Sequence, residues 1–459
     1  MGKSKVSEGF APLSARQWKQ QLQYELQGED YNKALVWESP EGIKVKPFYT
    51  EEDLGEQGTA AFAGPGAWKL AQSIRVTTPQ SANEVARHAL GYGAEALQFE
   101  MHEAASQPEL LLQGIDLKNT PLHFRLHSLQ PQQVDSLLAS ATSPTKGMYL
   151  HLDPIGRLAA RGHWQASQRE DLETLRMLLR QYRDTKGLQL LGVDGSLYQN
   201  AGANRVQQLA YMLAHANEYL HILGDAGHAP PVFTVAVGSD FFFEIAKLRA
   251  LRLLWGSLAA EYKLPEDCHI VAIPSRRNKT LYDYNTNMLR TTAECMSAIL
   301  GNANTLVNLP YDALYREPND FSARMARNPL LILKHEAHFG AVANPAEGAY
   351  YIESLTWQLA EKGLALFKQL EAGGGFIKQL KEHQIQKKVR ESADREQKLF
   401  DDGRLVLVGT NAHLQEGEQM KGQMERNPFK RQGARKTLIE PLLEKRLASG
   451  LEEKRLANE

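Results

Sequence analysis

The chain has 459 residues and a formal net charge of -1, with 53 lysines and arginines against 54 aspartates and glutamates. This length holds either a few ordinary domains or one large α/β barrel with extensions. The balanced charge argues against nucleic-acid binding and against a polybasic membrane surface. The first residues, MGKSKVSEGF, lack the apolar segment of a secretory signal, and no apolar run reaches the roughly 18 residues of a membrane helix. We therefore expect a soluble, cytoplasmic protein.

The cysteine content points to a reducing compartment. Cys268 and Cys295 are the only two cysteines, and their spacing fits neither a zinc site nor a redox dithiol. We expect both to be free thiols and assign no metal site to the chain.

The first 66 residues predict an arm. Residues 14–28 have the pattern of an amphipathic helix with Trp18, Leu22 and Leu26 on one face. The following stretch, to about Gly66, contains several prolines and too few apolar clusters to fold alone. We expect it to lie on its own barrel or on a partner chain.

From Trp68 onward, strand-like runs alternate with helical runs, which is typical of βαβ units and a parallel sheet. Eight such strands predict a (β/α)8 TIM barrel. The predicted strands are Lys69–Val76, Ala96–Met101, Leu122–His127, Met148–Asp153, Leu188–Asp194, Val232–Gly238, His269–Pro274 and Thr305–Leu309.

Polar and apolar residues alternate along the second, third and fourth strands. Helices cover the outer face of a barrel, so the polar set should point into the lumen. Because an unpaired charge there is costly, we predict that Glu100 meets Arg125 and that His123 or His151 joins them. The alternative is a set of antiparallel strands with one solvated face. The polar residues concerned are Gln98, Glu100, His123, Arg125, His127, Tyr149, His151 and Asp153.

After the predicted barrel strands, helices dominate. One should begin at Asn319 or Asp320, and a second at Tyr350 should end at the glycines 373–375, which we interpret as a helix end and linker rather than a phosphate loop. Lys378–Phe400 predicts a charged, solvated helix, and Arg404–Val408 predicts one further strand. The pentapeptide Glu-Lys-Arg-Leu-Ala occurs at 444–448 and again at 453–457, where we expect a terminal helix that docks on the barrel or on a partner.

In three segments, the identity of the residues is more informative than their hydrophobic periodicity. DFSARMARN at 320–328, LILKHE at 331–336 and NPAEGAYYIESLT at 344–356 follow one another in order. They resemble the segment that closes the barrel of the methylmalonyl-CoA mutase family. Phe242–Trp255 and Arg290–Leu300 resemble other family segments, and the resemblance extends over roughly residues 15–400.

The resemblance implies an active site that this chain lacks. Active members of the family read SGYHMQEAGA after the fifth strand, where the Tyr-His pair contacts the substrate thioester. Alignment on Ala201-Gly202-Ala203 places Ser196 at the Tyr position and Leu197 at the His position. Leucine can neither donate nor accept a proton, so that role is lost. On the first strand, Ser73 stands where active chains have a tyrosine.

Two further family motifs are missing. The loop after the seventh strand, at 272–278, has no His in place of the family's THxQTSGWS, and the run whose Arg holds the substrate carboxylate has no counterpart. Together, the four departures indicate a barrel without catalytic residues. Alternatives are an acid/base or metal set of Asp194, His151 and Asp153, and phosphate binding by Arg324 and Arg327, for which capping or salt bridges are the favoured interpretation.

The resemblance also implies a cofactor and a partner. Active single-chain members carry a flavodoxin-like domain whose DxHxxG histidine ligates the cobalt of adenosylcobalamin. We find no such motif, interpret His413 as a surface residue, and expect no flavodoxin-like cobalamin domain and no cofactor bound by this chain alone. The family includes heterodimers of a catalytic large (alpha) subunit and a shorter inactive relative. The chain is expected to be such a small subunit, stabilising a complex that isomerises methylmalonyl-CoA to succinyl-CoA, with adenosylcobalamin held by the large subunit.

We divide the chain into an N-terminal arm (1–66), a barrel (67–375) and a charged helical extension (376–459). Two other interpretations stay open. The chain could be an independent barrel enzyme that uses acid/base groups in a polar lumen, or a module that binds CoA esters without turnover.

Overall fold

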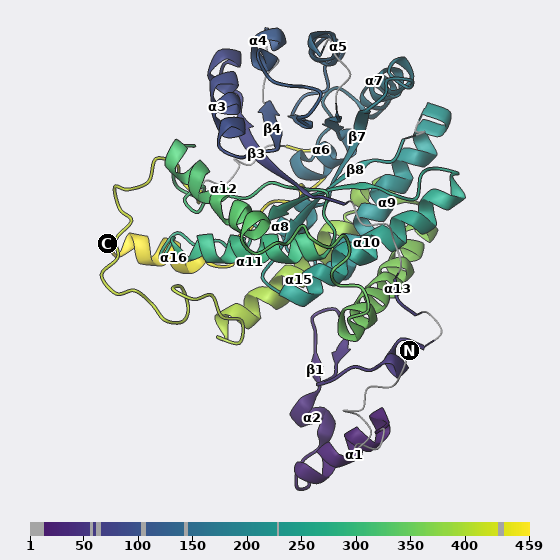
Figure 1. The fold of residues 1–459 in the computed structure, drawn as a ribbon, viewed down its shortest axis with the longest axis vertical. Helices are drawn as coiled ribbons and strands as arrows, with labels where there is room; N and C mark the ends of the chain where they lie inside the picture. Colours follow the sequence, from purple (N-terminus) through teal and green to yellow (C-terminus); the bar gives the residue numbers. More distant parts are fainter. Residues whose placement is uncertain are drawn as a thin grey trace.

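The computed structural model describes residues 13–55, 58–60, 66–101, 107–141, 146–226, 229–429 and 436–459. Eight parallel strands close into a barrel in the order β10-β3-β4-β5-β6-β7-β8-β9, surrounded by helices (Figure 1). The predicted (β/α)8 TIM barrel is confirmed, and the antiparallel alternative is wrong. The strands are β3 (Lys69–Arg75), β4 (Ala96–Met101), β5 (Leu122–Leu126), β6 (Met148–Leu152), β7 (Leu188–Asp194), β8 (Val232–Val237), β9 (His269–Pro274) and β10 (Thr305–Leu306).

The helices of the first half of the barrel begin in a way that the sequence encodes directly. α3, α4, α5 and α6 each have proline at the first helical turn, where its fixed φ suits the helix and its missing N–H costs nothing. The barrel helices are α3 (Pro79–Gly91), α4 (Pro108–Leu112), α5 (Pro131–Ser140), α6 (Pro154–Arg161), α7 (Gln168–Gln181), α8 (Ser196–Ala201), α9 (Arg205–Leu223), α10 (Phe241–Glu261), α11 (Thr286–Leu300), α12 (Asp320–His335) and α13 (Tyr350–Ala372).

The barrel strands contribute to two separate apolar clusters, one on each face of the sheet. Outward-facing strand residues such as Leu97, Phe99 and Phe124 pack against the helices in one continuous apolar cluster. Small and β-branched residues on the inner face form a separate cluster in the lumen: Ala71, Ala96, Val232, Val271 and Val307. Within the described residues, no helix has the length and apolar composition needed to cross a bilayer.

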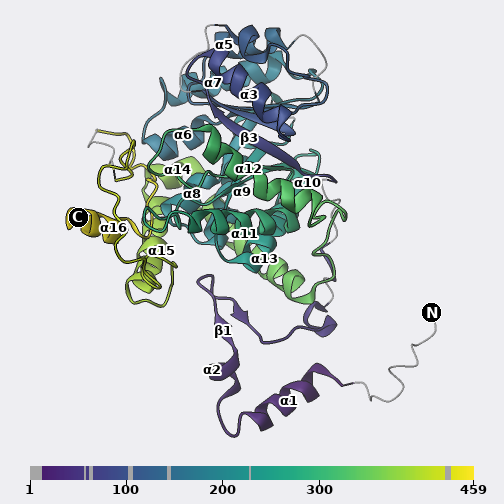
Figure 2. The same cartoon turned by 60° about the vertical axis from the view of Figure 1, so that its left-hand side comes forward.

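The N-terminal arm leaves the barrel and turns away from it (Figures 1 and 2). It contains α1 (Ala15–Glu25), α2 (Tyr31–Leu35), the two-stranded ribbon β1 (Trp37–Glu38) and β2 (Lys44–Val45), and the 3-10 turn η2 (Glu51–Asp53). The predicted helix is confirmed, and Ser14 and Gln17 form a capping box at its start. None of the residues of α1 is buried. Trp18 remains 45% exposed although its ring meets Phe48.

The C-terminal extension corrects two expectations. The charged run is helical, but it divides into α14 (Phe376–Lys381) and α15 (Gln384–Asp401) at His383, whose φ of 59° is left-handed. Arg404–Val408 is not a strand. The Asn411 side chain donates to the carbonyls of Phe400 and Leu405 and accepts from Leu407 N, so a turn takes up the groups that a strand would pair. The terminal helix is α16 (Ser449–Ala457).

A buried ion pair joins α10, α13 and the arm. Arg249 Nη2 lies 2.6 Å from Glu353 Oε1, and both side chains are fully buried. Glu353 Oε2 accepts from the backbone N–H of Ala60 at 2.9 Å. The pair therefore ties the two long helices to the point where the arm reaches the barrel.

Replacing Arg249 with methionine should lower the free energy of unfolding by about 3–5 kcal/mol, because Glu353 would keep a buried charge without its partner. The exposed pair Arg75–Glu317 provides the control, and Arg75→Met should cost below about 1 kcal/mol. Urea titration of the three chains measures both values. Equal losses of unfolding free energy in the two variants would show that burial does not increase the contribution of the Arg249–Glu353 pair to stability.

Candidate functional site

A cluster of charged side chains occupies the carboxyl end of the barrel, where barrel enzymes place their chemistry. Glu100 on β4 and Arg125 on β5 are register partners, and Arg125 Nε lies 3.9 Å from Glu100 Oε1. The predicted pair is thereby confirmed. The further members are Asp194, which forms a short ion pair with Arg125, and His127, whose Nε2 lies 3.7 Å from Glu100 Oε2. The expectation that His123 or His151 would join them is wrong.

The cluster is strongly ionised. Burial opposes the charge on Glu100, but Arg125, the nearby His127 and the hydrogen bond from Gln98 outweigh it and lower the pKa of Glu100 to about 2. Burial likewise opposes the charge on Arg125, and Asp194 and Glu100 raise its pKa above the ordinary value. Glu100 and Arg125 therefore both stay charged near neutral pH, so neither of these two groups is poised for proton transfer there.

The two histidines lie deeper, in a polar layer across the lumen. His123 Nδ1 is 3.0 Å from His151 Nε2, His123 Nε2 is 3.5 Å from Thr305 Oγ1, and Thr305 Oγ1 is 3.0 Å from His269 Nε2. Tyr149 fills the remaining space, with its ring centroid 4.5 Å from that of His123 and 4.3 Å from that of His269. These rings from three strands close the lumen at this level.

Neutral imidazoles satisfy the whole layer. One consistent set of tautomers has His151 donating to His123, His123 donating to Thr305, and the hydroxyl of Thr305 donating to His269. Burial lowers the pKa of His123 to about 3, and burial also lowers the pKa of His151 and His269. The layer is thus a hydrogen-bonded packing element that excludes charge.

Asp153 belongs to a structural network and not to a metal set. Its carboxylate caps α6 by accepting from Gly156 N at 2.7 Å, and it also accepts from Tyr219 Oη at 2.7 Å. His215 Nε2 lies 2.9 Å from the same oxygen and connects it to Tyr198. In the part of the chain that the structure describes, no group of three His, Cys, Asp or Glu side chains could hold a metal ion.

The positions that the resemblance marked as degenerate lie near the charged cluster. Ser196 opens α8 directly after β7, and its hydroxyl donates to Asp194 Oδ1. Leu197 is partly buried and packs against the main apolar core. Ser73 lies on β3, opposite Gln98 of β4. None of these three side chains presents an acid or base to the mouth of the barrel.

The remaining candidates have structural surroundings. Arg327 is buried and donates to the carbonyl of Tyr92, the C-cap residue of α3, and to Gln72 Oε1. Arg327 therefore caps the end of α3, which agrees with the capping interpretation and not with phosphate binding. His413 is exposed, as expected for a surface residue.

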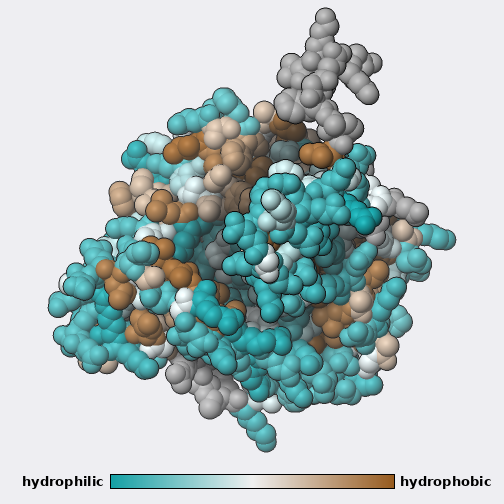
Figure 3. Space-filling view, turned by 90° about the horizontal axis from the view of Figure 1, so that it is seen from below, coloured by the Kyte–Doolittle hydropathy of each residue, from teal (hydrophilic) through white to brown (hydrophobic). Residues whose placement is uncertain are grey.

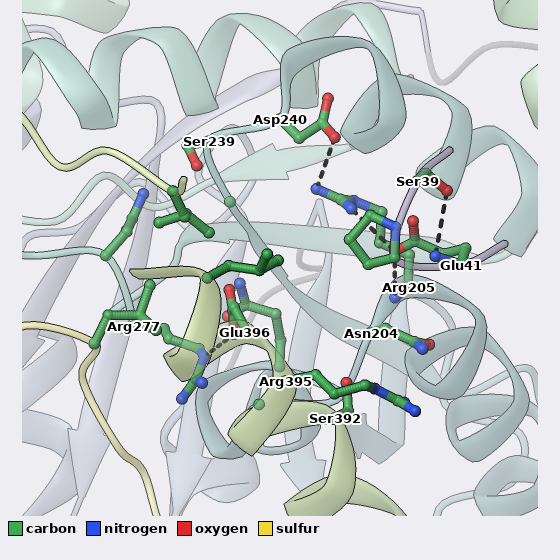
Figure 4. Close-up of a pocket in the computed structure, with 18 of the residues that line it drawn as sticks. Ser39, Glu41, Asn204, Arg205, Ser239, Asp240, Arg277, Ser392, Arg395 and Glu396 are labelled. Atoms are coloured by element: carbon green, nitrogen blue, oxygen red, sulfur yellow. Dashed lines mark hydrogen bonds and ion pairs between the residues drawn. The ribbon is translucent and has the colours of Figure 1, made fainter. Parts of the chain in front are cut away.

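Sequence reasoning missed a pocket of about 810 Å³ beside the carboxyl ends of β8 and β9 (Figure 4). Arg205 holds its arm-side wall, with ion pairs of 3.0 Å to Glu41, 3.3 Å to Asp240 and 3.0 Å to Glu244. Burial raises the pKa of Asp240, although Arg205 opposes this shift. No local signal foretells the site, because Glu41 comes from the arm and the other walls from α9, α10 and α15.

The lumen layer predicts acid sensitivity. The folded pKa of His123 lies near 3 and the ordinary value is 6.5, so the unfolded chain binds the extra proton first as the pH falls. Stability from this residue is complete above about pH 6.5 and is lost towards pH 3, at up to about 1.4 kcal/mol per pH unit. Unfolding free energies of the parent and of His123→Leu, measured from pH 7 to pH 4, should show a smaller slope in the variant.

Thr305→Val is the control, since it breaks the same hydrogen-bonded layer without removing a titratable group. It should lower stability and keep the slope of the parent. Identical slopes in the parent and in His123→Leu would contradict a buried neutral imidazole at this position.

The comparisons with known proteins agree with this architecture. The family model described as methylmalonyl-CoA mutase matches residues 108–454. The methylmalonyl-CoA mutase small subunit of Porphyromonas gingivalis is 32% identical over 89% of this chain and 71% of its own length. The small subunit of Streptomyces virginiae is 31% identical over 78% of this chain, and the large subunit of the same organism is 26% identical over 87%.

The chain spans 62% of the length of each Streptomyces virginiae subunit. The family model nevertheless covers most of the chain. The three segments that carry the resemblance, at 320–328, 331–336 and 344–356, all lie within the matched range. The chain therefore belongs to the methylmalonyl-CoA mutase family.

Proposed function

We propose that the chain is the small, non-catalytic subunit of a heterodimeric methylmalonyl-CoA mutase in the cytoplasm. Its partner is the large subunit, which carries out the isomerisation of methylmalonyl-CoA to succinyl-CoA. The small-subunit names of two relatives support this role, and the occurrence of both a small and a large subunit in Streptomyces virginiae supports a partnership of this kind.

The observation that carries the proposal is Leu197. The resemblance places a proton-donating histidine at this position in active chains, and here an apolar side chain packs into the core. Ser196, beside it, gives its hydroxyl to Asp194. A residue that cannot transfer a proton leaves the thioester carbonyl without the acid that the resemblance implies.

The filled lumen supports the same conclusion. His123, Tyr149 and His269 contact one another ring to ring across the barrel, and Thr305 joins them by hydrogen bonds. A substrate inside the barrel would have to displace this layer and leave its hydrogen bonds unmade, which costs about 1–3 kcal/mol for each buried group.

Three buried imidazoles of the described residues do not fit the cobalt of adenosylcobalamin, because their ring nitrogens already have partners. His123 and His151 hydrogen-bond to each other, and His215 is engaged with Asp153 and Tyr198. Each is committed to a buried structural network, so we assign the cofactor to the large subunit and derive no step through it here.

The arm provides a contact surface for the partner. In both ribbon views, α1 and α2 lie apart from the barrel (Figures 1 and 2). Leu13 is 69% exposed and Tyr24 is 81% exposed. Seen from below, the surface is mostly hydrophilic, with apolar side chains gathered in separate areas (Figure 3). We accordingly assign residues 1–66 to partner wrapping, 67–375 to the barrel and 376–459 to the extension.

Mixing the purified chain with a mutase large subunit from the same genome should yield co-elution on size exclusion and mutase activity that exceeds that of the large subunit alone. The chain alone should have no turnover, since neither the acid nor the cofactor is in place. In the same assay, Ser196→Tyr combined with Leu197→His should still give no activity without the partner.

Two results would contradict the proposal. Turnover by the isolated chain would favour an independent barrel enzyme. A rise in melting temperature with CoA esters, in the absence of any co-elution, would favour a CoA-ester-binding module.

Tyr24→Ala should weaken binding of the large subunit by about 1–3 kcal/mol, because exposed tyrosines on a contact segment often dominate an interface. Tyr92→Ala is the matched control, since Tyr92 is 61% exposed and caps α3, a helix drawn at the opposite end of the molecule from the arm (Figure 1). Isothermal titration of both variants measures the difference. Equal binding by the two variants would remove the arm from the interface.

A further inference from the structure

The end of the chain lies against the loops that follow the barrel strands. We call residues 437–459 the strap. Its backbone donates from Leu438 and Ile439 to the carbonyl of Gly162, at 2.8 and 3.0 Å. It continues with bonds from Leu442 to Ala159, from Lys445 to Asn200 and from Leu447 to Arg277. The strap thus crosses from α6, past α8, to the segment after β9.

Several residues of the strap are buried against the rest of the protein. Ile439, Leu447 and Ala448 are buried. At Gly162 the approach is so close that an added Cβ would lie 2.5 Å from the carbonyl oxygen of Ile439. The φ of Gly162, +77°, also favours glycine. The barrel surface is therefore shaped to receive this segment.

Two buried charges fasten the strap. Arg446 Nη1 lies 2.5 Å from Glu452 Oε2, and both side chains are almost wholly buried. Glu452 Oε1 accepts from the backbone N–H of Leu281 at 2.6 Å, and Arg446 Nη1 donates to the carbonyl of Lys279 at 3.2 Å. This latch, Arg446 with Glu452, is one of the points where the strap is bonded to the loop after β9, together with Glu459, which accepts from Tyr282 Oη at 2.6 Å.

The latch is incompletely satisfied. Arg446 Nη2 is buried and has no hydrogen-bond partner among the described residues. A buried donor without an acceptor reduces the net stability of the contact that buries it. Buried residues therefore hold the strap in place, but the unpaired Arg446 donor lowers the stability of the Arg446–Glu452 contact.

The strap also forms part of the pocket wall described above. Leu447 lines the pocket of about 810 Å³. The carbonyl of Lys445 accepts from Arg277 Nη1 at 2.7 Å, and Arg277 Nε lies 2.5 Å from Glu396 on α15 (Figure 4). If the strap detaches from the barrel, Leu447 no longer lines the pocket. The Arg277 side chain then also loses the carbonyl of Lys445 as a hydrogen-bond acceptor.

We propose that residues 437–459 act as a releasable strap, latched by Arg446 and Glu452, which controls access to the pocket between the arm, α9, α10 and α15. The closed form is the one described here. Release would open the pocket on the side of Leu447 while the barrel strands stay folded, because none of them hydrogen-bonds to the strap.

The test uses the full chain with Glu452→Gln. Glutamine can still accept from Leu281 N, but it removes the charge that pairs with Arg446. Glu453→Gln is the matched control, since Glu453 is the exposed neighbour. Hydrogen exchange should be about tenfold faster at the amides of Leu281 and Leu447 in Glu452→Gln than in Glu453→Gln, and unchanged at Phe233 in β8.

Pocket access is measured separately, with Ser392→Cys added to both variants. Ser392 is a buried residue of the pocket wall, and the two native cysteines are buried. A thiol reagent should modify position 392 about tenfold faster in the Glu452→Gln background, in step with the exchange rates. The exchange experiment uses chains without the added cysteine, so it stands even if Ser392→Cys does not fold.

Three outcomes would overturn the proposal. Equal exchange in the two variants would show that Glu452 fastens nothing. Equally accelerated exchange at Phe233 would show global unfolding and not release of the strap. Faster exchange without faster labelling at 392 would show that the strap does not control the pocket.

Discussion

The burial of polar side chains inside a closed barrel is the constraint from which much of the structure follows. Helices cover the outer faces of β4 and β5, so Glu100, His123 and Arg125 have no direction but inward. Inside, each charge needs a partner of opposite sign and each imidazole must stay neutral. The mouth of the barrel holds the ion pairs, and the level below holds the hydrogen-bonded rings. The lumen is consequently filled by interactions that stabilise the fold.

The same constraint accounts for the pairing of the acidic and basic groups at the carboxyl end of the barrel. Asp194 is bound to Arg125 and to Ser196, and Asp153 is bound to His215 and to the start of α6. Groups that resemble catalytic residues by type are already engaged with each other. Leu197 fits this pattern, because an apolar side chain at that position extends the core.

Periodicity and local turn chemistry were enough to predict the barrel. The eight strands were found within a few residues of their ends, and the Glu100–Arg125 pair followed from alternation on two neighbouring strands. His127 was on the same predicted face as Arg125, yet the choice between it, His123 and His151 depends on depth in the barrel, which alternation does not give. Arg404–Val408 was misread because Asn411, several residues later, binds the backbone there. The pocket could not be foreseen, because its walls are distant in sequence. The repeated pentapeptide shows the same limit: Arg446 in the first copy is buried against Glu452, whereas the second copy lies in α16.

The arm has one more consequence. It is fixed to the barrel where Trp37 packs on Phe243 and Glu41 binds Arg205, and again where Ala60 meets Glu353. Residues between these anchors are held at both ends, whereas α1, within the described residues, is joined to the barrel through the segment that follows it. A protein that has already docked on the barrel would therefore meet α1 at an effective concentration set by a short tether, not by diffusion. Even a weak contact with α1 would then add avidity to the complex, and it would do so without enlarging the contact on the barrel itself.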